Sequence, residues 1–86
     1  MATKEEFDQA IVRSKELTTR PSNEDLLTLY SLFKQATEGD VIGERPGGFD
    51  FKGAAKYDAW LAIKGLASEE AMGQYITLVN NLHSNQ

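Results

Sequence analysis

The segment from residue 22 to residue 39 constrains the fold more than any other, because its apolar residues cover a broad arc of the helix that it predicts. A helix on the surface of a domain needs an apolar stripe only about 100° wide. This segment carries Leu26, Leu27, Leu29, Tyr30, Leu32, Phe33 and Ala36. Such a width indicates a central helix that contacts two neighbours. It is also compatible with a helix that turns part of its arc toward an open groove for a hydrophobic ligand.

Turn signals separate this segment from three other helical patterns, and no strand pattern competes with them. Pro21 ends the first pattern, because proline disfavours helix in the residue before it. The expected helices run from about Lys4 to Leu17, from the candidate N-cap Ser22 to about Thr37, from Gly53 to Lys64, and from a cap at Ser68 to a tail that frays at His83. Since 86 residues allow one hydrophobic core, the sequence predicts a single all-α domain over residues 1–86.

Residues 38–51 form a long loop, EGDVIGERPGGFDF, between the second and third helices. Loops beyond about 12–15 residues are uncommon in compact domains and are usually functional or disordered. Val41, Ile42, Phe49 and Phe51 would provide apolar anchors. We therefore expect this loop to be ordered and packed across the bundle.

Composition and charge exclude several classes of function. The chain has no cysteine, which rules out disulfides, zinc–thiolate sites and cysteine nucleophiles and is typical of a reducing compartment. The net charge of −4 argues against nucleic acid as a partner. The acidic N-terminus and the lack of an apolar run of about 20 residues predict a cytoplasmic protein, expected to be monomeric and without stable membrane insertion. The segment from Arg45 to Lys64, however, contains four basic and two acidic residues. This local excess of positive charge favours a discrete anionic ligand.

Catalytic patterns are missing from the sequence. The one histidine, His83, falls in the expected tail, and the loop acids lack the spacing of a calcium loop. The glycines do not form a GxxxxGK[ST] phosphate loop, and no serine lies in the Asp-Ser-Leu setting of an acyl carrier. The sequence thus predicts a protein that is not an enzyme and that has neither a metal nor a cofactor.

Binding residues are suggested by pairs at helical spacing. Tyr30 and Lys34 are four residues apart, as are Lys52 and Lys56, so each pair projects from one face of its helix. A single lysine would be read as a solvated charge, and Tyr30 alone as a core residue. In combination, their hydroxyl and ammonium groups could converge on one phosphate beside an apolar surface, with Trp60 in the core beneath. The ligand expected is a phosphorylated nucleotide that carries an apolar tail.

These residues lie in segments that resemble the acyl-CoA-binding protein family, also called the diazepam-binding inhibitor family. The resemblance covers nearly the whole chain and is specific. It rests on RPSNEDLLTLYSLFKQATEGD, ERPGGFDFKGAAKYDAW, the dipeptide Lys64-Gly65 and EEAMGQYI. It implies an up-down-down-up four-helix bundle that binds long-chain fatty acyl-CoA esters non-covalently, as an intracellular carrier and pool former.

The resemblance also implies roles for individual residues. Tyr30, Lys34 and Lys56 would hold the ribose 3′-phosphate, Lys15 and Tyr75 would border the CoA head, and the acyl chain would lie along Leu26 and Leu27. The full set of candidate ligand contacts is Lys15, Leu26, Leu27, Tyr30, Ser31, Leu32, Phe33, Lys34, Lys52, Lys56 and Tyr75.

Three positions depart from the family pattern: Tyr57 replaces a tryptophan, Phe33 replaces a common tyrosine, and Ile11 is bulkier than usual. The lysine-rich C-terminal end of many members is also missing. The missing lysine-rich end would fit an alternative function, namely an interaction module whose broad apolar second helix docks a partner protein.

Overall fold

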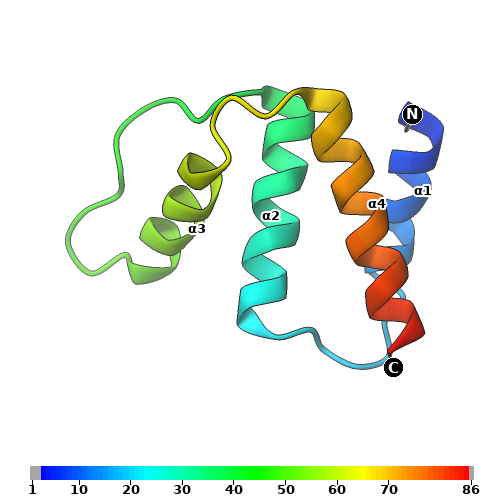
Figure 1. The fold of residues 1–86 in the computed structure, drawn as a ribbon. Helices are drawn as coiled ribbons and strands as arrows, with labels where there is room; N and C mark the ends of the chain where they lie inside the picture. Colours follow the sequence, from blue (N-terminus) through cyan, green and yellow to red (C-terminus); the bar gives the residue numbers. More distant parts are fainter. Residues whose placement is uncertain (1–2, 86) are drawn as a thin grey trace.

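The computed structural model describes residues 3–85 and contains four α-helices: α1 (Lys4–Ser14), α2 (Asn23–Glu38), α3 (Phe51–Ala62) and α4 (Ser68–Ser84). No strand occurs within residues 3–85. In Figure 1, α1 and α4 run down the view while α2 and α3 run up it, which is the up-down-down-up order. The predicted all-α four-helix fold is therefore confirmed.

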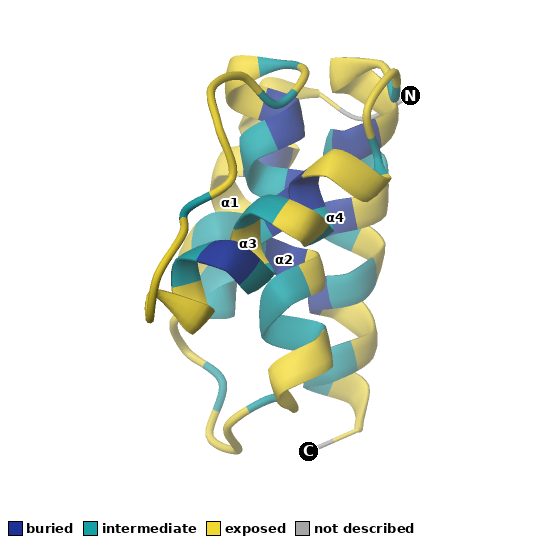
Figure 2. Cartoon of the chain, turned by 90° about the vertical axis from the view of Figure 1, so that its left-hand side faces the viewer, coloured by how far each residue is buried: buried dark blue, intermediate teal, exposed yellow. Residues whose placement is uncertain are grey.

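Helix α2 is the centre of the molecule. It packs against α4 on one side and α3 on the other, and α1 packs against α4 (Figure 1). The main buried cluster joins α1, α2 and α4 through Phe7, Ala10, Leu29, Leu32, Ala36, Ala71, Tyr75 and Val79. Figure 2 shows the buried positions concentrated where α2 and α4 meet. The broad apolar arc thus reflects a helix with two neighbours, as the first interpretation predicted.

Helix α3 is attached to α2 by a buried polar network as well as by apolar contacts. The side chain of Gln35 is only 1% exposed. Its Nε2 donates to the Asp40 carboxylate and to the Leu66 carbonyl, both at 2.8 Å. Its Oε1 accepts a hydrogen bond from Trp60 Nε1 at 3.0 Å. One α2 side chain therefore ties together the start of the long loop, α3 and the α3–α4 link.

Asp40 completes this network. Its Oδ1 also accepts a hydrogen bond from the Gly65 N–H at 2.7 Å. This bond and the one from Gln35 lower the pKa of the Asp40 carboxyl, because both donors favour its charged form. Gly39, which ends α2, and Gly65 have φ angles of +83° and +94°. Residues other than glycine rarely adopt such positive φ angles. Glycine at these two positions lets the chain leave α2 and enter α4.

We expect Gln35→Leu to lower the free energy of unfolding by about 2 kcal/mol, because the hydrogen bonds of the buried Gln35 side chain to Leu66, Asp40 and Trp60 would be lost and a leucine cannot replace them. Urea denaturation followed by far-UV circular dichroism measures this loss. Gln9→Leu, at an exposed site on α1, is the matched control and should leave the midpoint unchanged. A similar midpoint for both variants would contradict a structural role for Gln35.

The loop of residues 39–50 is held differently from the prediction. Ile42, Phe49 and Phe51 are 79%, 92% and 73% exposed, so they do not anchor the loop across the bundle. The contacts are polar and run to α3 instead: Arg45 forms two hydrogen bonds to Asp58, at 2.8 and 3.0 Å. The loop arches along the outer side of α3 in Figure 1.

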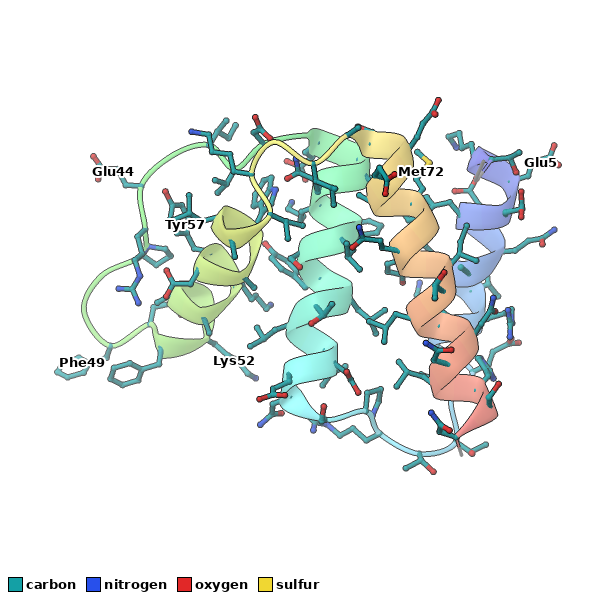
Figure 3. The ribbon with its side chains drawn as sticks, viewed as in Figure 1. Glu5, Glu44, Phe49, Lys52, Tyr57 and Met72 are labelled. Carbon is teal, nitrogen blue, oxygen red and sulfur yellow. The ribbon has the colours of Figure 1, made fainter. Side chains whose placement is uncertain are left out.

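Tyr57 is a second polar attachment of this loop. Its hydroxyl donates to the Gly43 carbonyl at 3.0 Å, and it lies on the loop side of α3 in Figure 3. The tyrosine that stands here in place of a tryptophan therefore supplies a hydrogen bond between α3 and the loop.

Four helix boundaries differ from the expected ones. Helix α1 ends at Ser14, not Leu17, because Lys15 N and Glu16 N donate to carbonyls only three residues back and tighten the last turn. Helix α3 ends at Ala62, not Lys64, and begins at Phe51, not Gly53, since the Asp50 carboxylate accepts a hydrogen bond from Gly53 N. The N-cap of α4 is Ala67, without a side-chain bond, so the predicted cap at Ser68 is wrong.

The predicted fraying at His83 is also wrong. Helix α4 continues to Ser84, and the His83 Nε2 atom lies 2.8 Å from the Arg13 carbonyl. The end of α4 is held by this contact with α1. Gln86, the last residue of the expected frayed tail, lies outside the described residues.

Candidate ligand-binding site

A cleft of about 530 Å³ lies between the first half of α2 and the first half of α3. Ser22 positions its α2 wall, because its hydroxyl caps the helix by accepting from Asp25 N at 3.1 Å. The Asp50 cap positions the α3 wall. The cleft is lined by Arg20, Asn23, Leu26, Leu27, Tyr30, Phe51, Lys52, Ala55 and Lys56.

The cleft joins apolar and cationic side chains from two helices. Leu26, Leu27 and the aromatic ring of Tyr30 come from α2, and Lys52 and Lys56 come from α3. Lys56 Nζ lies 5.2 Å from the centroid of the Tyr30 ring, within cation–π range. The structure therefore brings together five of the residues that the sequence suggested, with Lys56 beside the ring of Tyr30. Their convergence on one phosphate stays a prediction.

Lys34 lies one turn beyond Tyr30 and is only partly exposed. Its ammonium group pairs with the Glu38 carboxylate and sits 5.3 Å from the Trp60 ring centroid. The hydrogen bond to Glu38 raises the pKa of Lys34, partial burial opposes this shift, and the charge of Glu38 adds to it. Trp60 itself is 7% exposed, which agrees with its predicted place in the core. Lys34 is thus held by an ion pair that an anionic ligand would have to compete with.

Other suggested residues lie away from the cleft lining. Ser31 is 3% exposed and donates to the Thr28 carbonyl at 2.9 Å. Phe33 stacks on Phe7 with 6.2 Å between ring centroids. Tyr75 is 5% exposed, and its hydroxyl donates to Ser14 Oγ at 3.2 Å. Their direct contact with a ligand stays a prediction.

Lys15 and Leu32 also lie outside the lining of this cleft. Lys15 is exposed at the C-cap of α1. Leu32 is buried and faces α4, where it lines another groove. Their proposed ligand contacts likewise stay predictions.

Sequence reasoning missed Arg20, Asn23, Phe51 and Ala55. Arg20 Nη2 donates to Asn23 Oδ1 at 3.2 Å, which holds the guanidinium near the start of α2. Helical spacing could have found Asn23, four residues before Leu27, and Ala55, three after Lys52. Phe51 lies before Gly53, where α3 was expected to begin, and Arg20 lies in the link before α2, so neither fell within an expected helix.

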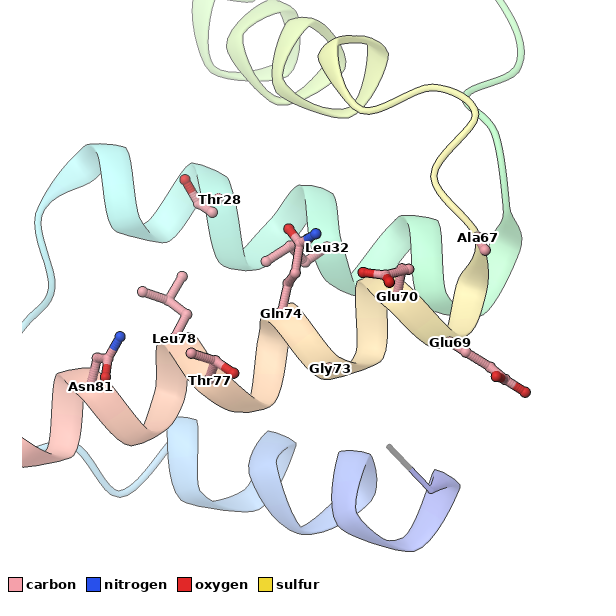
Figure 4. Close-up of a pocket in the computed structure, with 10 residues that line it drawn as sticks. All are labelled: Thr28, Leu32, Ala67, Glu69, Glu70, Gly73, Gln74, Thr77, Leu78 and Asn81. Carbon is pink, nitrogen blue, oxygen red and sulfur yellow. The ribbon is translucent and has the colours of Figure 1, made fainter. Parts of the chain in front are cut away.

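A second groove, of about 680 Å³, lies between α2 and α4 (Figure 4). It is lined by Thr28, Leu32, Ala67, Glu69, Glu70, Gly73, Gln74, Thr77, Leu78 and Asn81. None of these lining residues is basic, and Glu69 and Glu70 lie at one end of the groove. The α2–α3 cleft, not this groove, therefore suits an anion.

Residues 3–85 hold no cluster of three or more potential metal-binding His, Cys, Asp or Glu side chains. No helix in that range has the length and apolar character needed to cross a membrane.

Comparison with known proteins agrees with these features. Residues 4–79 match the model of the family described as acyl CoA binding protein. An acyl-CoA-binding protein of Brassica napus is 52% identical over 82 residues, which cover 95% of this chain and 89% of the relative. The crystal structure of Oryza sativa acyl-CoA-binding protein 2 has a TM-score of 0.90 and 48% identity, covering 95% of this chain and 91% of that one. A yeast acyl coenzyme A binding protein has a TM-score of 0.76 and 41% identity, with 96% of both chains covered. This chain therefore belongs to the acyl-CoA-binding protein family.

Proposed function

We propose that this chain binds long-chain fatty acyl-CoA esters non-covalently and serves as an intracellular carrier and pool former for them. The observation that carries the proposal is the α2–α3 cleft, where leucines and Phe51 share one cavity with lysines and a tyrosine. An acyl-CoA ester has the same division, with an apolar chain joined to a phosphorylated nucleotide. The relatives named acyl-CoA-binding proteins support the same ligand.

The proposed orientation pairs the phosphate with cationic and phenolic side chains and the acyl chain with leucines; Lys34 lies one turn beyond the cleft lining. Tyr30, Lys34 and Lys56 would hold the ribose 3′-phosphate, because lysine is a point cation suited to phosphate and a phenol can donate a hydrogen bond. The acyl chain would lie toward Leu26 and Leu27. Lys52 and Arg20 would add positive potential at the same cleft.

The proposed action is binding without chemical conversion. The polar groups that line the cleft are ammonium, guanidinium, amide and phenol groups, which stabilise an anion but do not activate water against a thioester. A cytoplasmic location is part of the proposal, since a small domain without cysteines suits a reducing compartment. The alternative of an interaction module is not favoured, because α3 and α4 pack against α2, whose apolar arc that module would use.

Calorimetric titration tests this function directly. Palmitoyl-CoA should bind far more tightly than free palmitate or free CoA, because only the ester fills both parts of the cleft. Native mass spectrometry of protein purified from cells should show retained acyl-CoA. Equal affinity for palmitate and palmitoyl-CoA, or purification without any acyl-CoA, would count against the carrier.

We expect Glu38→Gln to tighten palmitoyl-CoA binding by about two- to fivefold. The substitution frees Lys34 from an exposed ion pair, a class worth roughly 0.2–1 kcal/mol, and removes a like charge near the phosphate. Asp8→Asn is the matched control, because Asp8 pairs with Lys4 at the same four-residue spacing on α1. Calorimetry should show no change for Asp8→Asn. Unchanged or weaker binding for Glu38→Gln would mean that the pair does not compete with ligand.

A further inference from the structure

The α2–α3 cleft has an end that the proposed phosphate contacts do not use. Those contacts involve Tyr30 and Lys56, whose Nζ lies 5.2 Å from the Tyr30 ring centroid. Lys52 lies one turn earlier on α3, and Figure 3 shows its side chain extending toward the start of α2. Arg20 is held at the start of α2 by its hydrogen bond to Asn23. We call the part of the cleft that is lined by Arg20, Asn23 and Lys52 the far end.

Aliphatic side chains separate the far end from the proposed phosphate contacts. Asn23 and Tyr30 are seven residues apart on α2, which is about 10 Å along the helix axis. Leu26 and Leu27 lie between them and line the same cleft, as does Ala55 of α3. Along its length the cleft therefore presents cations, then an aliphatic wall, then cations again.

The cations of the far end have no acidic partner in the protein. Within residues 3–85, neither Arg20 nor Lys52 forms an ion pair, whereas Lys34 is paired with Glu38. The described residues that line the cleft include no aspartate or glutamate. The side chains of the far end are also exposed, so an anion that meets them keeps part of its hydration. The far end thus offers two unpaired cations to a ligand at little cost in desolvation.

We propose that the far end recognises a carboxylate at the tip of the acyl chain, so that the ligands of this protein include CoA monoesters of long-chain dicarboxylic acids. This inference rests on the proposed function, because the CoA group fixes the direction of the chain. A chain that runs along Leu26 and Leu27, away from the phosphate contacts, reaches Arg20. A guanidinium group matches the two oxygens of a carboxylate, and the ammonium group of Lys52 adds a second positive charge. A terminal methyl group forms no such contact.

Calorimetric titration with two matched ligands tests this inference. The first is the CoA monoester of hexadecanedioic acid, whose free carboxyl group is ionised at pH 7. The second is the same molecule with that carboxyl group converted to its methyl ester. At low salt the wild-type protein should bind the acid about tenfold more tightly than the methyl ester, through a charge-assisted hydrogen bond at an exposed site. High salt should lower this ratio, because exposed charges are screened.

Arg20→Gln identifies the group that reads the carboxylate. This variant should lower the ratio of the two affinities from about tenfold to about twofold, and Lys52 supplies what remains. Arg13→Gln is the matched control, because Arg13 is also hydrogen-bonded to an asparagine, Asn80, but lies on α1 and does not line the cleft. It should leave the ratio unchanged. Free palmitate, which carries a carboxylate without CoA, should bind far more weakly than the acid to the wild type.

Several results would overturn the inference. Equal affinity of the wild-type protein for the acid and the methyl ester would do so without any variant, and would assign the far end to another part of the CoA group. A ratio that Arg20→Gln leaves unchanged, or that Arg13→Gln lowers equally, would also contradict it. Palmitoyl-CoA separates the two proposals. A protein that binds palmitoyl-CoA but shows no preference for the acid keeps the carrier function and loses this inference. A protein that binds none of these CoA esters refutes both.

Discussion

Affinity for acyl-CoA esters should rise at least about a thousandfold from acetyl-CoA to palmitoyl-CoA. Each buried methylene contributes about 0.8 kcal/mol, so about ten methylenes along the cleft would contribute roughly 8 kcal/mol. Ordering the chain offsets part of this gain, and about half of it is enough for a thousandfold change. Calorimetric titration with acetyl-, octanoyl- and palmitoyl-CoA measures the slope of the binding free energy against acyl-chain length.

The cleft walls should determine this slope. Leu27→Ser exposes a hydroxyl where the chain is expected to lie and should flatten the dependence on chain length. Leu61→Ser is the matched control, because Leu61 is 44% exposed on α3 and does not line the cleft. Equal affinity for acetyl-CoA and palmitoyl-CoA would refute the apolar part of the site.

The second large expected change in affinity comes from removing the lysines proposed to hold the ribose 3′-phosphate of the ligand. Lys34→Ala and Lys56→Ala should each weaken palmitoyl-CoA binding by roughly 1.5–3 kcal/mol, the usual contribution of a hydrogen bond to a charged group. Against palmitoyl-dephospho-CoA, which lacks this phosphate, the same substitutions should cost much less. The losses should also be non-additive, since both lysines would contact one anion.

Lys4→Ala is the control for general positive charge. Lys4 lies on α1 and, like Lys34, forms an ion pair with an acid four residues later. Its loss should not change the affinity. If Lys4→Ala weakens binding as much as the other two, or if removing the phosphate leaves the losses unchanged, Lys34 and Lys56 do not form a phosphate clamp.

Features that depend on neighbours along the chain could be predicted from the amino-acid sequence. Ser22 and Gly39 mark the two ends of α2, because capping and positive φ are local requirements. The broad apolar arc of α2 indicated a central helix, since apolar residues on both sides of the arc are stabilised by burial against neighbouring helices. The spacing of Tyr30, Lys52 and Lys56 identified residues of the cleft, because residues four apart share one helical face.

Which helix faces are covered, and which groups distant in the sequence meet, could not be predicted in this way. Gln35 of α2 is hydrogen-bonded to Trp60 of α3 and to Leu66 in the link between α3 and α4. No local sequence pattern identifies these three residues as partners. The loop anchors were predicted to be apolar, yet Arg45 reaches Asp58 and leaves Phe49 exposed. In each case, an apolar side chain is stabilised by burial, but the packing of distant helices determines whether a neighbour is present to bury it.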